Sequence, residues 1–256
     1  MDLQLKGKNA VVLGGTRGIG RAIAETLAGE GVHIALCSRN ADAAAEAAGA
    51  LAAKGVKALG RPADMANGQQ IRNFIHEAGA ALGGIDILIS NASALDMGNS
   101  DEAWLHGLKT DVLGAVNAVD AALPFLTGAA EKHGDAAIVL IASVSAAEAS
   151  SAQSYGAMKA ALIHYGKGLA RQHAGKKIRT NVISPGTIYF KGGVWEMIEK
   201  GAPEMFKNSL ARNPLGRMGT PQEIANVAVF LASPAASFTT GANVIVDGGI
   251  TARVNY

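Results

Sequence analysis

The sequence has little cysteine, few aromatic residues and no excess of charge of either sign. Cys37 is the single cysteine among 256 residues, so no disulfide can form within the chain. Aromatic residues make up 5% of the chain, and 23 basic residues stand against 21 acidic ones, with no long run of Lys and Arg to follow a phosphate backbone. Nucleic acid is therefore not an expected partner.

The chain also lacks a long hydrophobic run, a linker and a targeting signal. No stretch reaches the roughly 18 consecutive apolar residues of a membrane span. The start MDLQLKGKNAVVLGG has no basic segment followed by an apolar run and a cleavage site. We expect a cytoplasmic protein with no membrane association, and one domain over residues 1–256, because no change in composition divides the chain.

Short aliphatic runs alternate with longer Ala-rich segments, and hydrophobic residues make up 49% of the chain. The runs are NAVVLG, VHIALCS, IDILIS, AAIVLIAS, IRTNVIS and NVIVDG, with VKALGR as a weaker candidate. Helical spacing, such as Ile19, Ile23 and Leu27, lies between them. This pattern predicts an α/β fold with a doubly wound, parallel sheet of seven strands and helices on both faces. Residues 187–218 break the rhythm and predict an insertion.

A glycine-rich turn, GGTRGIG, follows the first predicted strand and leads into a helix. Gly14, Gly18 and Gly20 would permit a tight turn and a close approach of the backbone to a pyrophosphate at the helix N-terminus. The spacing is not GxGxxG, so the turn gains its meaning from its position in a βαβ unit. We interpret it as a dinucleotide phosphate site.

The end of the second predicted strand bears on the choice of cofactor. An acidic residue there would hold the ribose hydroxyls of NAD, but the sequence reads CSRN. Arg39 offers a planar cation at this place, and Arg17 can approach from the first turn, so the two could hold a 2′-phosphate. This favours NADP(H); the alternative is that both arginines are solvated loop residues.

The stretch SYGAMKAAL places Tyr155 and Lys159 four residues apart, one turn apart on one face if the stretch is helical. A fixed cation beside a phenol favours the phenolate, so the pair could act as a tuned acid. Tyr and Lys at this spacing are also common on helix surfaces, and only the context can decide.

Several segments in chain order resemble motifs of the short-chain dehydrogenase/reductase family, and the resemblance extends over essentially the whole chain. GGTRGIG is similar to its glycine motif, SNAS at 90–93 to its Asn-Asn-Ala-Gly turn, IASVS at 141–145 to its serine segment, and Tyr155 with Lys159 to its YxxxK. SPGTI at 184–188 and the tail NVIVDGG match its later cofactor loop and last strand. The pattern is nearest to the 3-oxoacyl-[acyl-carrier-protein] reductase-like branch.

The resemblance implies a Rossmann-type fold, a nicotinamide cofactor and hydride exchange between a carbonyl and a secondary alcohol. Tyr155 would donate the proton, Lys159 would assist it and hold the nicotinamide ribose, and Ser143 would donate a hydrogen bond to the substrate oxygen. Ser143 stands one residue nearer to the tyrosine than is usual, and Ser145 is the alternative.

The resemblance also implies a cofactor site, and the spacing of the histidines predicts no metal site. The cofactor residues would be Gly14, Thr16, Arg17, Gly18, Ile19, Gly20, Ser38, Arg39, Asp64, Met65, Asn91, Ala92, Ser93, Tyr155, Lys159, Pro185, Gly186 and Ile188. Ser93 stands where the family has glycine, and Phe190 stands where a threonine is common. The six histidines show no spacing typical of metal ligands.

The largest departure from the family lies in TDVLGAVN, where Asp111 aligns with a catalytic asparagine. An aspartate can still accept a bond from the water of the family's proton relay. If Asp111 faces the active site, its carboxylate should stabilise the ammonium of Lys159 and oppose ionisation of Tyr155. At a separation of about 8 Å and an effective dielectric constant of about 20, the opposing interaction is about 2 kcal/mol.

The predicted insertion is rich in large apolar residues and cations. The apolar ones are Tyr189, Phe190, Trp195, Met197, Met205 and Phe206, and the cations are Lys191, Lys200, Lys207 and Arg212. The apolar set is typical of a lid over an apolar substrate and equally of core or oligomer packing. The cations could attract a carboxylate or phosphopantetheine-bearing partner, or could be a solvated face.

The sequence thus predicts an NADP(H)-dependent oxidoreductase that acts on a hydrophobic or acyl-type ketone or the matching secondary alcohol, assembled as a homotetramer by family resemblance. One alternative is an NAD-dependent dehydrogenase of a sterol, aromatic or sugar alcohol. A second alternative is a weakly catalytic family member that senses NADPH or binds a partner. The reason to consider it is that Asp111 stands where the family has a catalytic asparagine.

Overall fold

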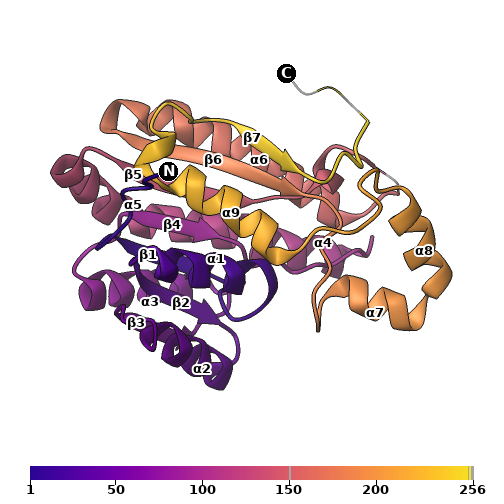
Figure 1. The fold of residues 1–256 in the computed structure, drawn as a ribbon, viewed down its shortest axis with the longest axis horizontal. Helices are drawn as coiled ribbons and strands as arrows, with labels where there is room; N and C mark the ends of the chain where they lie inside the picture. The colour runs from indigo at the N-terminus through magenta and orange to yellow at the C-terminus, as the bar shows by residue number, and fades with distance from the viewer. Residues whose placement is uncertain (150, 253, 255–256) are drawn as a thin grey trace.

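Strands and helices alternate along the chain (Figure 1), and a computed structural model describes them for residues 1–149, 151–252 and 254. The strands are β1 Asn9–Leu13, β2 His33–Ser38, β3 Ala58–Pro62, β4 Ile87–Ser90, β5 Ala136–Ile141, β6 Ile178–Pro185 and β7 Asn243–Val246. The α-helices are α1 Gly18–Gly29, α2 Ala41–Ala52, α3 Gly68–Leu82, α4 Asp101–Gly107, α5 Gly114–His133, α6 Ser154–His173, α7 Val194–Gly201, α8 Pro203–Ala211 and α9 Pro221–Ala232. One π-helical turn, Leu108–Leu113, joins α4 to α5.

The seven strands form one parallel sheet in the order β3-β2-β1-β4-β5-β6-β7. The order of winding reverses between β1 and β4, the place where doubly wound sheets bind ligands beyond the carboxyl ends of their strands. The predicted α/β fold is confirmed, and the weak candidate VKALGR covers β3 except for its last residue, Pro62.

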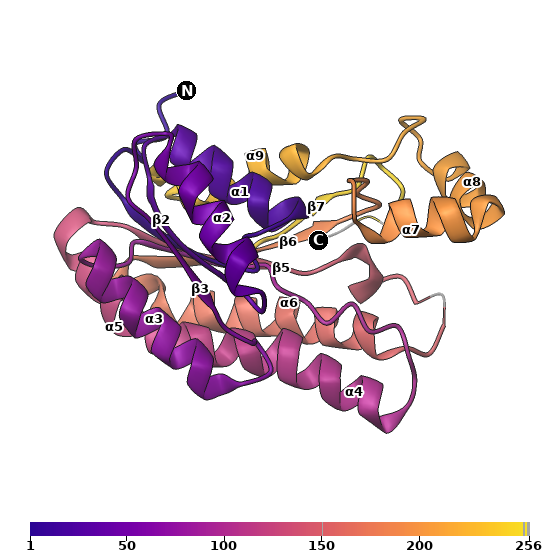
Figure 2. The ribbon, with the colours of Figure 1, turned by 90° about the horizontal axis from the view of Figure 1, so that it is seen from below.

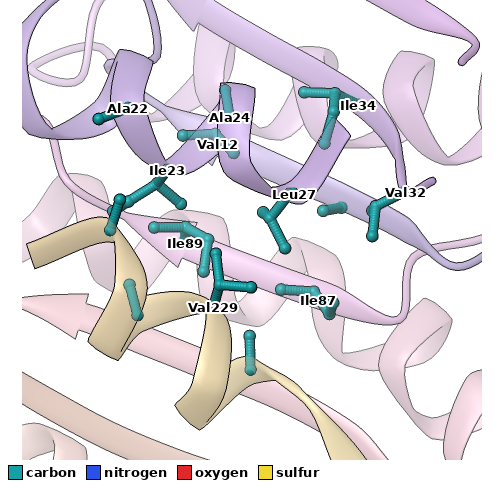
Figure 3. Packing of buried hydrophobic residues seen from close by; sticks show 14 of the residues in the cluster. Val12, Ala22, Ile23, Ala24, Leu27, Val32, Ile34, Ile87, Ile89 and Val229 are labelled. Carbon is teal, nitrogen blue, oxygen red and sulfur yellow. The ribbon is translucent and has the colours of Figure 1, made fainter. Parts of the chain in front are cut away.

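Helices cover both faces of the sheet, as Figure 2 shows with α1, α2 and α9 on one side and α3, α5 and α6 on the other. Alternate residues of a strand face opposite layers: Val12 packs with the first set, and Val11 and Leu13 pack with the second. In Figure 3, Ile23 and Leu27 of α1 lie between the strands and Val229 of α9. Burial on both faces fixes the carboxyl ends of the strands as a rigid platform.

The segment predicted as an insertion contains α7 and α8, which extend beyond the sheet at one end of the molecule (Figures 1 and 2). Neither helix contains a buried residue. Pro203 begins α8, where its fixed backbone angle suits the first turn. The following helix, α9, is anchored by a capping box between Thr220 and Glu223.

The continuous helical segment Asp101–His133 is long and apolar enough to cross a membrane by length and composition alone, with 39% of its most apolar window buried. Core helices of soluble proteins pass the same test. Here α5 packs in the second hydrophobic layer through Ala118, Ala122 and Leu126.

Candidate active site

A cavity of about 1000 Å³ opens at the carboxyl ends of the strands, between the sheet and the helices α7 and α8. It is lined by most of the residues that the sequence predicts for the site: Gly14, Thr16, Arg17, Ile19, Ser38, Arg39, Asp64, Met65, Asn91, Ala92, Ser93, Ser143, Tyr155, Lys159, Pro185, Gly186 and Ile188. Gly18, Gly20 and Asp111 lie outside this lining. The first two support the turn, and Asp111 lies behind Ser93 and Lys159.

The glycine-rich turn is closely packed, and side chains would not fit at two of its positions. Gly14 has a φ of +73°, and a Cβ there would lie 2.9 Å from Ala92. A Cβ on Gly20 would lie 2.1 Å from the carbonyl oxygen of Gly14. The side-chain amide of Asn91 donates to that carbonyl at 3.0 Å. The turn therefore brings bare backbone to the cavity wall, as a pyrophosphate site requires.

The two predicted phosphate-binding arginines, Arg17 and Arg39, both line the cavity. In the described part of the chain, neither Arg17 nor Arg39 has a carboxylate within ion-pair distance. The guanidinium of Arg17 donates to the carbonyl of Gly192 at 3.4 Å, and the ring of Phe190 packs against Gly18. The start of the insertion therefore touches the glycine-rich turn.

Tyr155 and Lys159 lie in the first turns of α6, and both line the cavity. Lys159 is 1% exposed, and its Nζ lies 5.6 Å from the centre of the Tyr155 ring. The ammonium donates to the carbonyl oxygen of Ile141, at the end of β5, at 3.1 Å. The spacing of four residues along α6 thus places the buried ammonium of Lys159 beside the phenol of Tyr155, which lines the cavity.

Asp111 lies in the π-helical turn and forms an ion pair with Lys159, with its Oδ1 2.9 Å from Nζ and both side chains 2% exposed. The same carboxylate accepts from the hydroxyl of Ser93 at 2.5 Å and from the backbone amide of Ala94 at 2.9 Å. A turn of this wider type is rare and often occurs at functional sites. Sequence reasoning anticipated Asp111 near Lys159 but missed the contact with Ser93.

Both candidate serines line the cavity, and their backbone geometry distinguishes them. The amide of Ser145 donates to Ser143 Oγ at 3.1 Å, so the oxygen of Ser143 is held and its own proton is free to donate elsewhere. Ser143 is 9% exposed. This arrangement supports Ser143 as the donor to a substrate oxygen, with Ser145 as the residue that orients it.

The rest of the cavity lining is mainly apolar. The insertion contributes Val194, Trp195, Met197, Ile198 and Met205 to it, and the rest of the chain contributes residues that the sequence analysis did not select as site residues: Leu95, Met97, His106, Val144, Glu148 and Ile250. Met97, Met197 and Met205 are each more than half exposed, so this wall offers apolar surface that no part of the described chain covers. Methionines adapt to ligands of varied shape.

Two further titratable groups that line the cavity, His106 and Cys37, are respectively paired and buried. His106 lies 3.2 Å from Asp96, whose pKa is lowered, first by the amide of Gly98 and then by this histidine. Burial raises the pKa of the Cys37 thiol to about 12, so the thiol stays protonated at neutral pH. Over the described ranges, no three His, Cys, Asp or Glu side chains gather as metal ligands do.

Comparison with known proteins agrees with this geometry. Residues 14–251 match the family model described as enoyl-(acyl carrier protein) reductase. The chain is 38% identical to isoepoxydon dehydrogenase of Penicillium expansum over 96% of this chain and 95% of that protein, and 32% identical to the 3-oxoacyl-[acyl-carrier-protein] reductase of Staphylococcus aureus over 95% and 98%. The structure of L-sorbose reductase from Gluconobacter frateurii with NADPH and L-sorbose superposes with a TM-score of 0.90 at 32% identity, covering 99% of this chain and 100% of that one.

A parallel, doubly wound sheet with a glycine turn and a Tyr/Lys pair at its carboxyl edge defines a nicotinamide-dependent oxidoreductase. The chain belongs to the short-chain dehydrogenase/reductase family. Members of this family are NAD(P)-dependent dehydrogenases and reductases that act on CH–OH and C=O groups.

Proposed function

We propose that the protein is an NADP(H)-dependent oxidoreductase that transfers hydride between the nicotinamide and the carbonyl or secondary alcohol of a hydrophobic or acyl-type substrate. The observation that carries this is one cavity whose lining includes Arg17 and Arg39, the three residues Ser143, Tyr155 and Lys159, and many apolar side chains. The sorbose reductase that shares this fold was solved with NADPH, which agrees with the choice of cofactor.

The bound nicotinamide supplies or accepts the hydride, and the chain's residues handle the proton. In reduction, the hydroxyl of Tyr155 donates its proton to the carbonyl oxygen as negative charge develops there. The ammonium of Lys159 favours the phenolate that remains. Ser143 donates a hydrogen bond to the same oxygen, held for this by the amide of Ser145. In oxidation, the Tyr155 phenolate takes the proton of the alcohol.

The apolar wall supports a hydrophobic substrate, whereas one relative is an isoepoxydon dehydrogenase and one structural neighbour is a reductase of L-sorbose. Absorbance of NADPH can be followed with a panel of 3-oxoacyl thioesters, cyclic enones and ketoses. Turnover highest with the long apolar ketones supports the proposal. Turnover restricted to ketoses would reassign the substrate. If the protein binds NADPH but turns over no substrate of the panel, the result would favour the alternative of a weakly catalytic protein that senses NADPH or binds a partner.

We also propose a cytoplasmic homotetramer. The helix α4 and the π-helical turn present Trp104, Leu105, Leu108 and Leu113 to solvent, with exposed fractions from 37% to 53%. Large side chains clustered on one exposed segment favour burial against another subunit. Molar mass from light scattering in solution tests this assembly.

A further inference from the structure

The Asp111 carboxylate connects three segments of the chain at one buried point. It contacts Lys159 of α6 and, in the turn after β4, accepts from the hydroxyl of Ser93 and the amide of Ala94. These three donors occupy both carboxylate oxygens, so the side chain has little freedom to turn. Fixing it also fixes where its negative charge lies relative to Lys159.

The hydroxyl of Ser93 forms two hydrogen bonds, one as a donor and one as an acceptor. It donates to Asp111 and accepts from the backbone amide of Leu95 at 3.2 Å. Leu95 has a φ of +52°, a left-handed conformation that costs free energy for a leucine. Leu95 lines the cavity next to other apolar residues such as Met97. One hydroxyl therefore supports both the carboxylate behind Lys159 and a strained residue in the substrate wall.

We propose that Ser93 is a positioning residue, whose hydroxyl holds Asp111 against Lys159 and holds Leu95 in the substrate wall. This inference rests on the proposed function for its activity readouts. It explains two departures from the family by one contact, because glycine at 93 would have no hydroxyl to donate to the carboxylate at 111. Position 93 then acts through Asp111 and Leu95 and donates no proton to the substrate.

The position of Asp111 determines how far the charge of Lys159 is compensated. Lys159 Nζ has three protons, and Ile141 and Asp111 accept two of them, so one remains for other partners. A firmly paired carboxylate weakens the effect of the ammonium on Tyr155, whereas a loosened one strengthens it. Loss of the Ser93 hydroxyl should therefore shift the pH midpoint of alcohol oxidation downward.

Other charged groups face this unit less directly. Tyr155 is the titratable neighbour on α6, and on α4 His106 is paired with Asp96. After β5, Glu148 lies 3.9 Å from Arg212. The remaining titratable or charged groups of the cavity are Cys37, Arg17, Arg39 and Asp64. None of these forms an ion pair with Lys159 or Asp111 in the described residues, so the substitution at 93 should act through the pair itself.

The test compares Ser93→Ala, Ser93→Thr and Ser100→Ala with the wild type. For Ser93→Ala we expect the pH midpoint of oxidation to fall by about half a pH unit and KM for the best ketone to rise about threefold, since one charge-assisted bond is lost. Ser93→Thr keeps a hydroxyl and should restore the wild-type midpoint. Ser100→Ala removes a hydroxyl of the same connection that interacts with the first turn of α4, at Ala103 and Glu102, and should leave the midpoint unchanged.

A second measurement needs no turnover. Urea unfolding of the cofactor-free wild type, Ser93→Ala, Asp111→Asn and the double variant should give less-than-additive losses of stability, because a bond to an ionised acceptor is stronger than one to a neutral amide. Additive losses, or an oxidation midpoint in Ser93→Ala that is unchanged or raised, would overturn the role of Ser93. If the wild type turns over no substrate, the proposed function fails, and the unfolding cycle alone decides on Ser93.

Discussion

At the scale of single residues, Arg17 and Arg39 offer the sharpest test of cofactor choice. Both line the cavity without a carboxylate partner in the described residues, so they are free to receive a phosphate. We expect NADPH to bind at least about tenfold more tightly than NADH, because charge-assisted contacts to one phosphate contribute about 1.5–3 kcal/mol. Fluorescence titration of both cofactors measures this. Equal affinities, or a preference for NADH that Arg39→Ala leaves unchanged, would contradict the assignment.

Removal of the Tyr155 hydroxyl should separate chemistry from binding. Tyr155→Phe keeps the ring near Lys159 but removes the proton that the carbonyl needs, so turnover should fall about 100- to 10,000-fold. The affinity for NADPH should change little, because most of the predicted cofactor residues lie elsewhere in the cavity lining. Half of the wild-type turnover in this variant would mean that another acid is used.

The two serines can be ranked in the same assay. Ser143→Ala should lower turnover more than Ser145→Ala, because only the backbone amide of Ser145 is needed to hold Ser143 Oγ, and alanine keeps that amide. Rates are compared at saturating NADPH with the best substrate of the panel. A larger loss in Ser145→Ala would assign the donor role to Ser145.

Asp111 gives a prediction about pH with a definite sign. Its carboxylate compensates the ammonium of Lys159 at 2.9 Å and opposes a phenolate at Tyr155. Asp111→Asn removes that opposition, so the pH midpoint of alcohol oxidation should move down, by at most about 1.5 pH units, while substantial activity remains. The pH profiles are recorded at constant salt. Asp96→Asn is the control variant, because it removes a carboxylate that pairs with His106 and not with Lys159. Coincident profiles, or an upward shift, would contradict this role.

Much of this site could be predicted from the sequence, because its residues follow strand ends whose positions the hydrophobic pattern reveals. Arg39 after β2 and Lys159 one turn beyond Tyr155 are examples. The hydrogen bond from Ser93 to Asp111 could not be predicted, because the two residues lie in different segments of the chain. The Asp111 carboxylate reaches the Ser93 hydroxyl from a π-helical turn. Nothing in the letters LKTDVL distinguishes that turn from an ordinary helix.

At the scale of elements, α7 and α8 should be the least stable helices. They bury no residue, and many of their charges pair within the same helix, as Lys200 does with Glu196. Local opening then exposes little apolar surface, so backbone amides there should exchange with solvent much faster than those of α1, whose Ile23 and Leu27 are buried. Hydrogen exchange followed by mass spectrometry makes the comparison.

Cofactor binding should change this exchange. Phe190 packs on Gly18 and Gly192 accepts from Arg17, so the start of the insertion touches the predicted phosphate turn. Saturating NADPH should slow the exchange of backbone amides in α7 and α8. Exchange in α5, which packs in the opposite layer, should not change and is the internal control. Equal exchange of α7 and α1 without cofactor, or no slowing in α7 with it, would show that these helices are a fixed wall.

Sequence reasoning anticipated seven strands but treated residues 187–218 only as an insertion. Buried strands are recognisable because they are continuous aliphatic runs. The helices of the insertion follow a mixed pattern of aromatic, Met and Lys residues, which is typical of a lid, a core or an oligomer contact alike. Their fold depends on the cavity that they cover and on contacts such as the hydrogen bond of Tyr189 to Glu199, and these are tertiary features.

At the scale of the whole molecule, the two helical layers on either side of the sheet differ in how completely their apolar side chains are buried. The layer of α1, α2 and α9 is sealed by aliphatic residues from both ends of the chain, such as Ile23 and Val229. The opposite layer carries α6 with Tyr155 and Lys159, and beside it α4 and the π-helical turn leave large apolar side chains in water. The helix that holds the proposed catalytic pair thus lies beside the segment that we propose as a subunit contact.

The assembly can be tested directly on that exposed segment. Light scattering on the wild type should give about four times the 26.0 kDa of one chain. The double variant Leu105→Glu and Leu113→Glu should give a smaller species, because burying unpaired carboxylates in an interface is costly. Leu215→Glu is the control, since it places the same charge on an exposed leucine outside α4. A monomeric wild type, or a double variant with the same mass as the wild type, would contradict an interface at α4 and would leave Trp104 and its neighbours as a surface with another purpose.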